Sequence, residues 1–308
     1  MLQPVAPVQP EIVPLEQLDD DALAAIAFGA AVPGAMLSVD VPQLGDVELV
    51  EVWRSASPVR RTSRDGIVLA ANDDVIVGSL TCDDADAHRA AACVYDRLIG
   101  VARAEGYPHV LRVWNHVRDI NRVEHGLERY RAFSAGRHEA FTKHGYAMRS
   151  DLPAASAVGM SAGGVTSYFI ASREPAMSAE NPRQVSAYDY PPRYGPRSPS
   201  FSRAMRGAGL VFVSGTASVV GHETKHAGDV ARQLEETLVN LDAIVRAAGA
   251  SAMLIAKVYV RRRDDYPLIA ARLREAMPRT QTMFLHAELC RADLLVEIDG
   301  VAPASRRP

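Results

Sequence analysis

One order of predicted elements occurs twice in this chain, and this internal repeat constrains the fold more than any other feature. A β-branched run at 73–80 ends in Gly-Ser, and a similar run at 209–218 ends in Ser-Gly. Runs of this kind, bounded by turn residues, are typical of strands. Each is followed by a long helical pattern, over 85–105 and over 230–248, that closes on a glycine, as helices often do. We therefore expect the same unit to form twice.

Each half continues with a strand, a shorter helix and a closing strand. In the second long helix, apolar residues recur every three or four positions and predict one stripe that faces a sheet. The later elements are expected at 110–119, 126–144 and 165–171 in the first half, and at 254–264, 266–276 and 294–301 in the second. The repeat therefore predicts an α+β protein of two tandem modules, each a mixed β-sheet with helices on one face.

These elements divide the chain into four expected segments: an N-terminal extension (1–40), a first module (41–175), a connecting segment (176–203) and a second module (204–308). The stretch around the connecting segment, from Arg173 to Arg203, contains six prolines, which is typical of a linker. It also holds three tyrosines and five arginines, a composition that favours an ordered segment lining a pocket. Both interpretations stay open, and we favour the ordered one.

Composition excludes several classes of function. The formal net charge of −3 comes from 34 basic and 37 acidic residues without long blocks of one sign, so no nucleic-acid or membrane partner is indicated. No apolar run approaches the roughly 18 residues that span a bilayer, and the first residues do not resemble a signal peptide, so we expect a cytoplasmic protein. The three cysteines and nine histidines show no metal-ligand spacing, so we expect neither a metal nor a disulfide framework.

An acid lies inside the last predicted strand, in the stretch CRADLLVEIDG at 290–300. Alternation puts Leu294, Val296 and Ile298 on one face, and Leu295, Glu297 and Asp299 on the other. If the second face met solvent, Glu297 would be an ordinary surface acid. If it were covered, its carboxyl would be a candidate catalytic group.

Two arginines and a tyrosine are further candidates. Arg137 follows Tyr130 by seven residues and Phe133 by four, which places its guanidinium on the apolar face of a helix. It then needs either a structural salt bridge or a bound carboxylate. Arg197 lies in a proline-bounded loop that could aim it at a ligand, or leave it solvated. Tyr194, three residues earlier, could contact the same ligand or simply pack in the loop.

Five blocks together resemble the chorismatase family: WNHVRDIN (114–121), GLERYRAFSAGRHEAF (126–141), NPRQVSAYDYPPRYGPRSPSF (181–201), FVSGTASVVGHET (212–224) and ELCRADLLVEIDG (288–300). The C-terminal half alone also resembles the RidA/YjgF fold. Chorismatases are built from two such RidA/YjgF-like (chorismate-mutase-like) modules, of which one retains an intact site. This matches the repeat.

The resemblance implies cofactor-free cleavage of the enolpyruvyl ether of chorismate, with release of pyruvate. In this interpretation Glu297 is the general acid that protonates the terminal methylene carbon of the ether. Chorismate carries two carboxylates, for which Arg137 and Arg197 are the expected cationic partners, with Tyr188 and Tyr194 completing the substrate-binding set.

The resemblance also implies that small residues near the ring select the product. Ala217 and Cys290 are the expected positions. The cysteine favours 3-hydroxybenzoate, whereas the alanine favours hydrolysis to a dihydroxycyclohexadiene carboxylate. We expect a hydroxybenzoate, mainly the 3-isomer with the 4-isomer as an alternative.

Two other functions stay open. An imine deaminase of the RidA type would need an arginine just before the last strand, where Leu289 and Cys290 stand and Arg291 is offset. A non-catalytic binding module with a degenerate site is the other. Single modules of this fold commonly form trimers, so we expect a monomer or a homotrimer.

Overall fold

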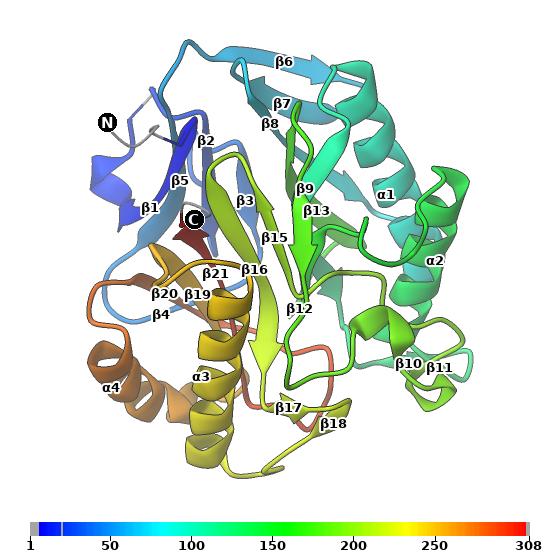
Figure 1. Ribbon diagram of the computed structural model, residues 1–308, viewed down its shortest axis with the longest axis vertical. Coiled ribbons are helices and arrows are strands. Elements are labelled where there is room, and N and C mark those ends of the chain that lie inside the picture. Colours follow the sequence, from blue (N-terminus) through cyan, green and yellow to red (C-terminus); the bar gives the residue numbers. More distant parts are fainter. Residues whose placement is uncertain (1–5, 20, 306–308) are drawn as a thin grey trace.

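The first half of the chain forms a six-stranded mixed sheet with two helices on its outer face (Figure 1). The computed structural model describes residues 6–19 and 21–305. The elements of this half are β6 (Arg60–Arg64), β7 (Ile67–Ala71), β8 (Val75–Cys82), α1 (Ala87–Ala104), β9 (His109–Arg118), β10 (Val123–Glu124), β11 (Leu127–Glu128), α2 (Arg129–Lys143), β12 (Ala154–Met160) and β13 (Val165–Ser172). The sheet order is β12-β9-β13-β8-β7-β6, and β10 and β11 form a separate hairpin.

The second half repeats this design with a seven-stranded sheet. Its elements are β14 (Met177–Ala179), η2 (Ala187–Asp189), η3 (Pro192–Tyr194), β15 (Ala204–Gly207), β16 (Leu210–Ala217), β17 (Val219–Val220), β18 (Glu223–Thr224), α3 (Val230–Ala247), β19 (Ile255–Val260), η4 (Arg263–Asp265), α4 (Tyr266–Ala276), β20 (Gln281–His286) and β21 (Val296–Pro303). The sheet order is β14-β15-β16-β21-β19-β20-β4, in which β4 (Gln43–Leu44) comes from the N-terminal region. The predicted α+β class and the repeated order of elements are confirmed.

A third, four-stranded sheet is formed by the N-terminal residues. It consists of β1 (Val8–Pro14), β2 (Ala24–Phe28), β3 (Leu37–Val39) and β5 (Leu49–Ser55), in the order β1-β5-β2-β3, and η1 (Leu15–Gln17) follows β1. A boundary at residue 40, where the sequence suggested that an extension ends, would cut this sheet, because β5 pairs with both β1 and β2. β1, β2, β3 and β5 are therefore part of the packed structure.

Capping residues explain why the two long helices begin and end where they do. The Asp86 side chain accepts hydrogen bonds from the backbone N–H groups of His88 and Arg89 at the start of α1, and Asp229 accepts one from Arg232 in α3. These contacts satisfy N–H groups that have no partner within the helix. Both helices are followed by a glycine with positive φ, as the sequence pattern indicated.

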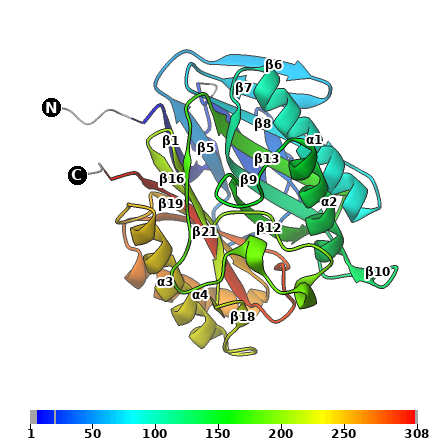
Figure 2. The same cartoon turned by 45° about the vertical axis from the view of Figure 1, so that its right-hand side comes forward.

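The inner faces of the two large sheets meet, so that α1 and α2 lie on one side of the molecule and α3 and α4 on the other (Figure 2). β12 contacts β16 across this junction, where the backbone N–H of Ala155 donates to Ser214 Oγ at 2.9 Å. The N-terminal sheet closes a third side, and Trp53 of β5 packs against Trp114 and Phe212. The inner face of β21 therefore lies between the layers rather than in solvent, and Glu297 and Asp299 are buried there.

β12 and β20 are among the strands that were not predicted from the sequence. β12 consists mostly of alanine, serine and glycine, which have low strand propensity, but such small residues allow it to lie close to β16. β20 is short and begins with polar residues. The last strand also starts two residues later than expected, so Leu294 lies before it and does not share a face with Val296.

Among the described residues, no helix is long and apolar enough to span a membrane. The same part of the chain contains no group of three or more His, Cys, Asp or Glu side chains arranged to hold a metal ion.

Candidate active site

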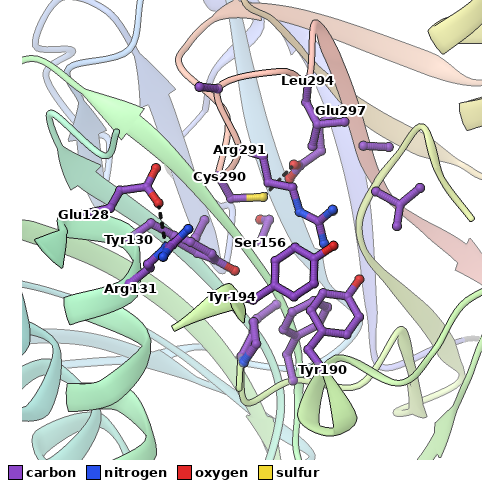
Figure 3. Close-up of a pocket in the computed structure, with 18 of the residues that line it drawn as sticks. Glu128, Tyr130, Arg131, Ser156, Tyr190, Tyr194, Cys290, Arg291, Leu294 and Glu297 are labelled. Atoms are coloured by element: carbon purple, nitrogen blue, oxygen red, sulfur yellow. Dashed lines mark hydrogen bonds and ion pairs between the residues drawn. The ribbon is translucent and has the colours of Figure 1, made fainter. Parts of the chain in front are cut away.

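A cavity of about 360 Å³ lies between the two modules. The first module contributes α2 and β12, the second contributes β16, β21 and the segment before β21, and the connecting segment also lines the cavity (Figure 3). The lining residues are Glu128, Tyr130, Arg131, Arg137, Ala155, Ser156, Ala157, Gln184, Tyr190, Tyr194, Pro199, Phe201, Arg203, Gly215, Ala217, Val219, Cys290, Arg291, Ala292, Asp293, Leu294 and Glu297. Because the connecting segment helps to form the walls, its ordered interpretation is the one that the structure supports.

Glu297 lies on the inner face of β21 and is only 4% exposed. Its neighbours in the sheet are Ala217 on β16 and Tyr259 on β19. Burial, and next the negative charge of Asp299, raise the pKa of Glu297 to about 7. The carboxyl therefore retains its proton up to neutral pH while facing the cavity, which is the state that a general acid needs.

A glycine makes room for this carboxyl. The β16–β21 register shifts between Val213 and Thr216, which marks a β-bulge, and Gly215 lies in it. A Cβ atom at Gly215 would come 2.8 Å from Glu297 Cδ and closer still to Glu297 Oε1. Any side chain at this position would displace the acid.

Arg137 points its guanidinium into the cavity from α2. The residue is 1% exposed, and its Nε and Nη2 atoms have no hydrogen-bond partner. Its Cζ lies 5.1 Å from the ring centre of Phe133 and 5.8 Å from that of Phe201. Within the described residues no carboxylate pairs with it, so the structural salt bridge is not formed. A buried cation with free donors is suited to bind an anionic ligand.

Three further arginines line the cavity and were not predicted: Arg131, whose Nε lies 3.3 Å from Glu128 Oε2, Arg203 and Arg291. Arg203, at the end of the connecting segment, donates to Tyr190 Oη at 2.7 Å, and its Nε has no partner. Arg291 lies over the ring of Tyr194, 4.5 Å from its centre, and donates to the backbone oxygen of His222 at 3.0 Å. Arg291, which in the sequence is offset from the position that an imine deaminase requires, thus forms part of the cavity wall.

The structure does not bring all predicted substrate-binding residues together. Tyr194 lines the cavity, but Tyr188 packs against the helices of the first module, and Tyr190, two residues later, takes the lining position. Arg197 is exposed and is not among the lining residues. Its proline-bounded loop directs the guanidinium outward, so the solvated alternative is the one observed.

The two expected product-determining residues both lie beside the acid. Ala217 pairs with Glu297 across the sheet, and Cys290 Sγ lies 3.8 Å from Glu297 Oε2 (Figure 3). Burial and the nearby Glu297 raise the pKa of Cys290 to about 12. The thiol is therefore neutral and donates its weak hydrogen bond to the carboxyl rather than acting as a nucleophile.

Comparison with known proteins agrees with this architecture. A family model described as "Chorismatase FkbO/Hyg5-like, N-terminal" matches residues 51–171, and one described as "Endoribonuclease L-PSP" matches residues 196–304. A crystal structure of a chorismatase superposes with a TM-score of 0.85 at 31% identity, covering 98% of this chain and 100% of that one. The fold is therefore that of a chorismatase with RidA/YjgF-like modules.

Curated relatives cover most of the chain as well. A 3-hydroxybenzoate synthase from Streptomyces hygroscopicus is 40% identical over 277 residues, covering 82% of this chain and 80% of that protein. A chorismatase from Streptomyces rapamycinicus is 38% identical, with 83% of each chain covered. With this identity over most of both chains and the same two-module fold, the protein belongs to the chorismatase family.

Proposed function

We propose that this protein cleaves the enolpyruvyl ether of chorismate and releases pyruvate without a cofactor. The observation that carries the proposal is the buried carboxyl of Glu297, which faces a cavity lined by four arginines. Family membership and relatives named chorismatase and 3-hydroxybenzoate synthase support the same substrate.

The first chemical step is proton transfer from Glu297 to the terminal methylene carbon of the enol ether. The electron pair of the double bond forms the new C–H bond, and the ether carbon becomes an oxocarbenium centre that an oxygen nucleophile can attack. Carbon accepts protons slowly, so a positioned acid is expected to contribute on the order of 10²–10⁴ in rate. The burial that raises the pKa of Glu297 to about 7 keeps this proton available near neutrality.

Three of the four lining arginines account for recognition of a dianion, because Arg131 is already paired with Glu128. Arg137 offers two donors without a partner and Arg203 offers one, whereas Arg291 is already partly engaged by a backbone oxygen and two tyrosine rings. Charge-assisted hydrogen bonds from such donors would bind the two carboxylates and hold the ether against Glu297. As expected from the fold, we propose a monomer or a homotrimer.

We favour 3-hydroxybenzoate as the aromatic product. Rearrangement of chorismate to pyruvate and a hydroxybenzoate takes up no water, whereas hydrolysis to the dihydroxycyclohexadiene carboxylate takes up one. Cys290 and Ala217 flank the acid where the attacking oxygen must approach. Replacing Cys290 by Ala should therefore shift the product ratio toward the diol more than it lowers pyruvate release.

Incubation of the protein with chorismate, without added metal, tests the proposal when pyruvate and the ring products are separated by chromatography. The proposal predicts one pyruvate for each chorismate consumed, together with mainly 3-hydroxybenzoate. Absence of pyruvate under all conditions would reject the activity. Pyruvate accompanied mainly by the diol would retain the cleavage step and reverse the product assignment.

A further inference from the structure

A cluster of buried charges lies next to the proposed acid, between the sheets. Glu51, Arg112, Lys257 and Asp299 are each at most 1% exposed, and they come from three different sheets. Lys257 Nζ lies 2.8 Å from Glu51 Oε2 and 3.5 Å from Asp299 Oδ1, and Arg112 Nη2 lies 3.0 Å from Asp299 Oδ2. Burying four charges is costly, and such clusters seldom add net stability. A functional reason should therefore be sought.

Asp299 is the member of the cluster closest in the chain to Glu297, and it is held as an anion. Its Oδ2 accepts hydrogen bonds from Ser156 Oγ at 2.9 Å and from Tyr259 Oη at 3.0 Å, in addition to the contact with Arg112. Burial alone would raise the pKa of Asp299, but Lys257 and Arg112 outweigh it and lower the pKa below its ordinary value.

The geometry links this anion to the acid. Asp299 follows Glu297 by two residues on the same face of β21, so the two side chains are neighbours. Tyr259 is paired with Glu297 across the sheet and donates to Asp299. Ser156, which donates to Asp299, also lines the cavity. The same groups that fix Asp299 thus surround Glu297.

We propose that Asp299 is a positioning residue for the acid: its permanent negative charge, held by Arg112 and Lys257, keeps the proton on Glu297 until substrate takes it. The inference rests on the proposed cleavage of chorismate. Two carboxyls with divergent environments, one ionised and one protonated, are a general means of assigning a proton to one of them. The other charged or titratable groups that face the pair are Glu51 from β5, His116 from β9, Tyr130 from α2, Tyr168 from β13, Tyr259 from β19, Arg203 from the connecting segment, and Cys290.

Two variants with opposite charge changes test this role. Asp299→Asn removes the negative charge, so Glu297 should lose its proton at lower pH. Arg112→Gln removes a positive charge and leaves Asp299 less neutralised, so Glu297 should keep its proton to higher pH. The measured quantity is the ratio of kcat/KM for chorismate at pH 8 to that at pH 6, taken within each variant, because this ratio does not depend on the fraction of folded protein.

The ratio is expected to fall by about fivefold in Asp299→Asn and to rise by about fivefold in Arg112→Gln, which corresponds to a shift of about one pH unit each way. If neither variant folds, Tyr259→Phe removes only one hydrogen bond from Asp299 and should raise the ratio slightly. A merely structural cluster would lower activity at both pH values and leave the ratio unchanged, and that outcome would overturn the inference. Absence of pyruvate from the unmodified protein would instead reject the proposed function.

Discussion

The two modules share an order of elements, but their closing strands, β13 and β21, differ in the side chains that point into the junction between the sheets. The alternating inner positions of β13 are Thr166, Tyr168 and Ile170, which carry no carboxyl group. Those of β21 are Glu297, Asp299 and Val301. The first module instead supplies partners for the acids of the second, because Arg112 binds Asp299 and Arg137 reaches the cavity. The fold is thus repeated, but only the closing strand of the second module carries carboxyl groups on its inner face.

β8 and β16, the strands that precede the long helices, each contain a glycine, and these two glycines also have different surroundings. A Cβ at Gly78 of β8 would meet Phe169 and Leu69, which are core residues under the helices of the first module. A Cβ at Gly215 of β16 would meet the carboxyl of Glu297. One glycine therefore serves packing and the other serves the site.

The largest effect is expected for Glu297→Gln. Loss of the transferable proton should lower kcat for pyruvate release by about 10²–10⁴ with little change in KM, because the amide retains the size of the carboxyl. Thr166→Val, on the inner face of the closing strand of the other module, is the matched control and should stay within about twofold of the unmodified protein. Equal losses in both variants would break the comparison between the modules.

A second pair of variants tests whether Gly215 serves the site while Gly78 serves packing of the core. Gly215→Ala should displace the Glu297 carboxyl and lower kcat by about 10², since small misplacements of reacting groups have effects of this size. Gly78→Ala should overpack the first core and lower the free energy of unfolding by about 1–3 kcal/mol, with kcat of the folded protein unchanged. Steady-state kinetics and thermal unfolding measure the two effects. A stability loss without a kinetic loss in Gly215→Ala would contradict the assignment.

The smallest effect of the three is expected for Arg137→Met. Removing a charge-assisted contact of about 1.5–3 kcal/mol should raise KM for chorismate by about 10–150-fold. The second helix of the other module offers the control, because Arg272 of α4 is partly exposed and bound to Glu235. Arg272→Met should leave KM within about twofold. A similar KM in both variants would show that Arg137 does not contact substrate.

Sequence periodicity predicted the helices whose position depends on neighbouring residues in the sequence. α4 spans the predicted residues, and α1 and α3 agree to within two residues at each end, because their apolar stripes and capping groups are local in sequence. β12 and the N-terminal sheet were missed because their strands are set by distant partners. In β12, packing against β16 overrides the low intrinsic strand propensity of alanine, serine and glycine.

The site residues also divide into those that local sequence patterns indicate and those that only tertiary contacts reveal. Arg137 was predicted as a site residue because it is a charge on an apolar helix face, and Glu297 because it is an acid inside a strand that otherwise looks buried; both line the cavity. Arg197 and Tyr188 were misplaced because the direction of a side chain in an irregular loop is not encoded by periodicity. Arg203 and Arg291 lie within or beside the quoted blocks, but only the tertiary contacts with Tyr190 and Tyr194 distinguish them from surface arginines.

The central claim concerns the protonation state of one carboxyl, which difference infrared spectroscopy can measure directly. The carboxylic C=O band that is present in the unmodified protein and absent from Glu297→Gln reports on Glu297 alone. Titration of this band should give a midpoint near pH 7, the value to which burial and Asp299 raise the pKa of Glu297. A midpoint near the ordinary value of about 4.3 for a solvated glutamate would contradict the account, because the proposed acid would then be ionised at neutral pH.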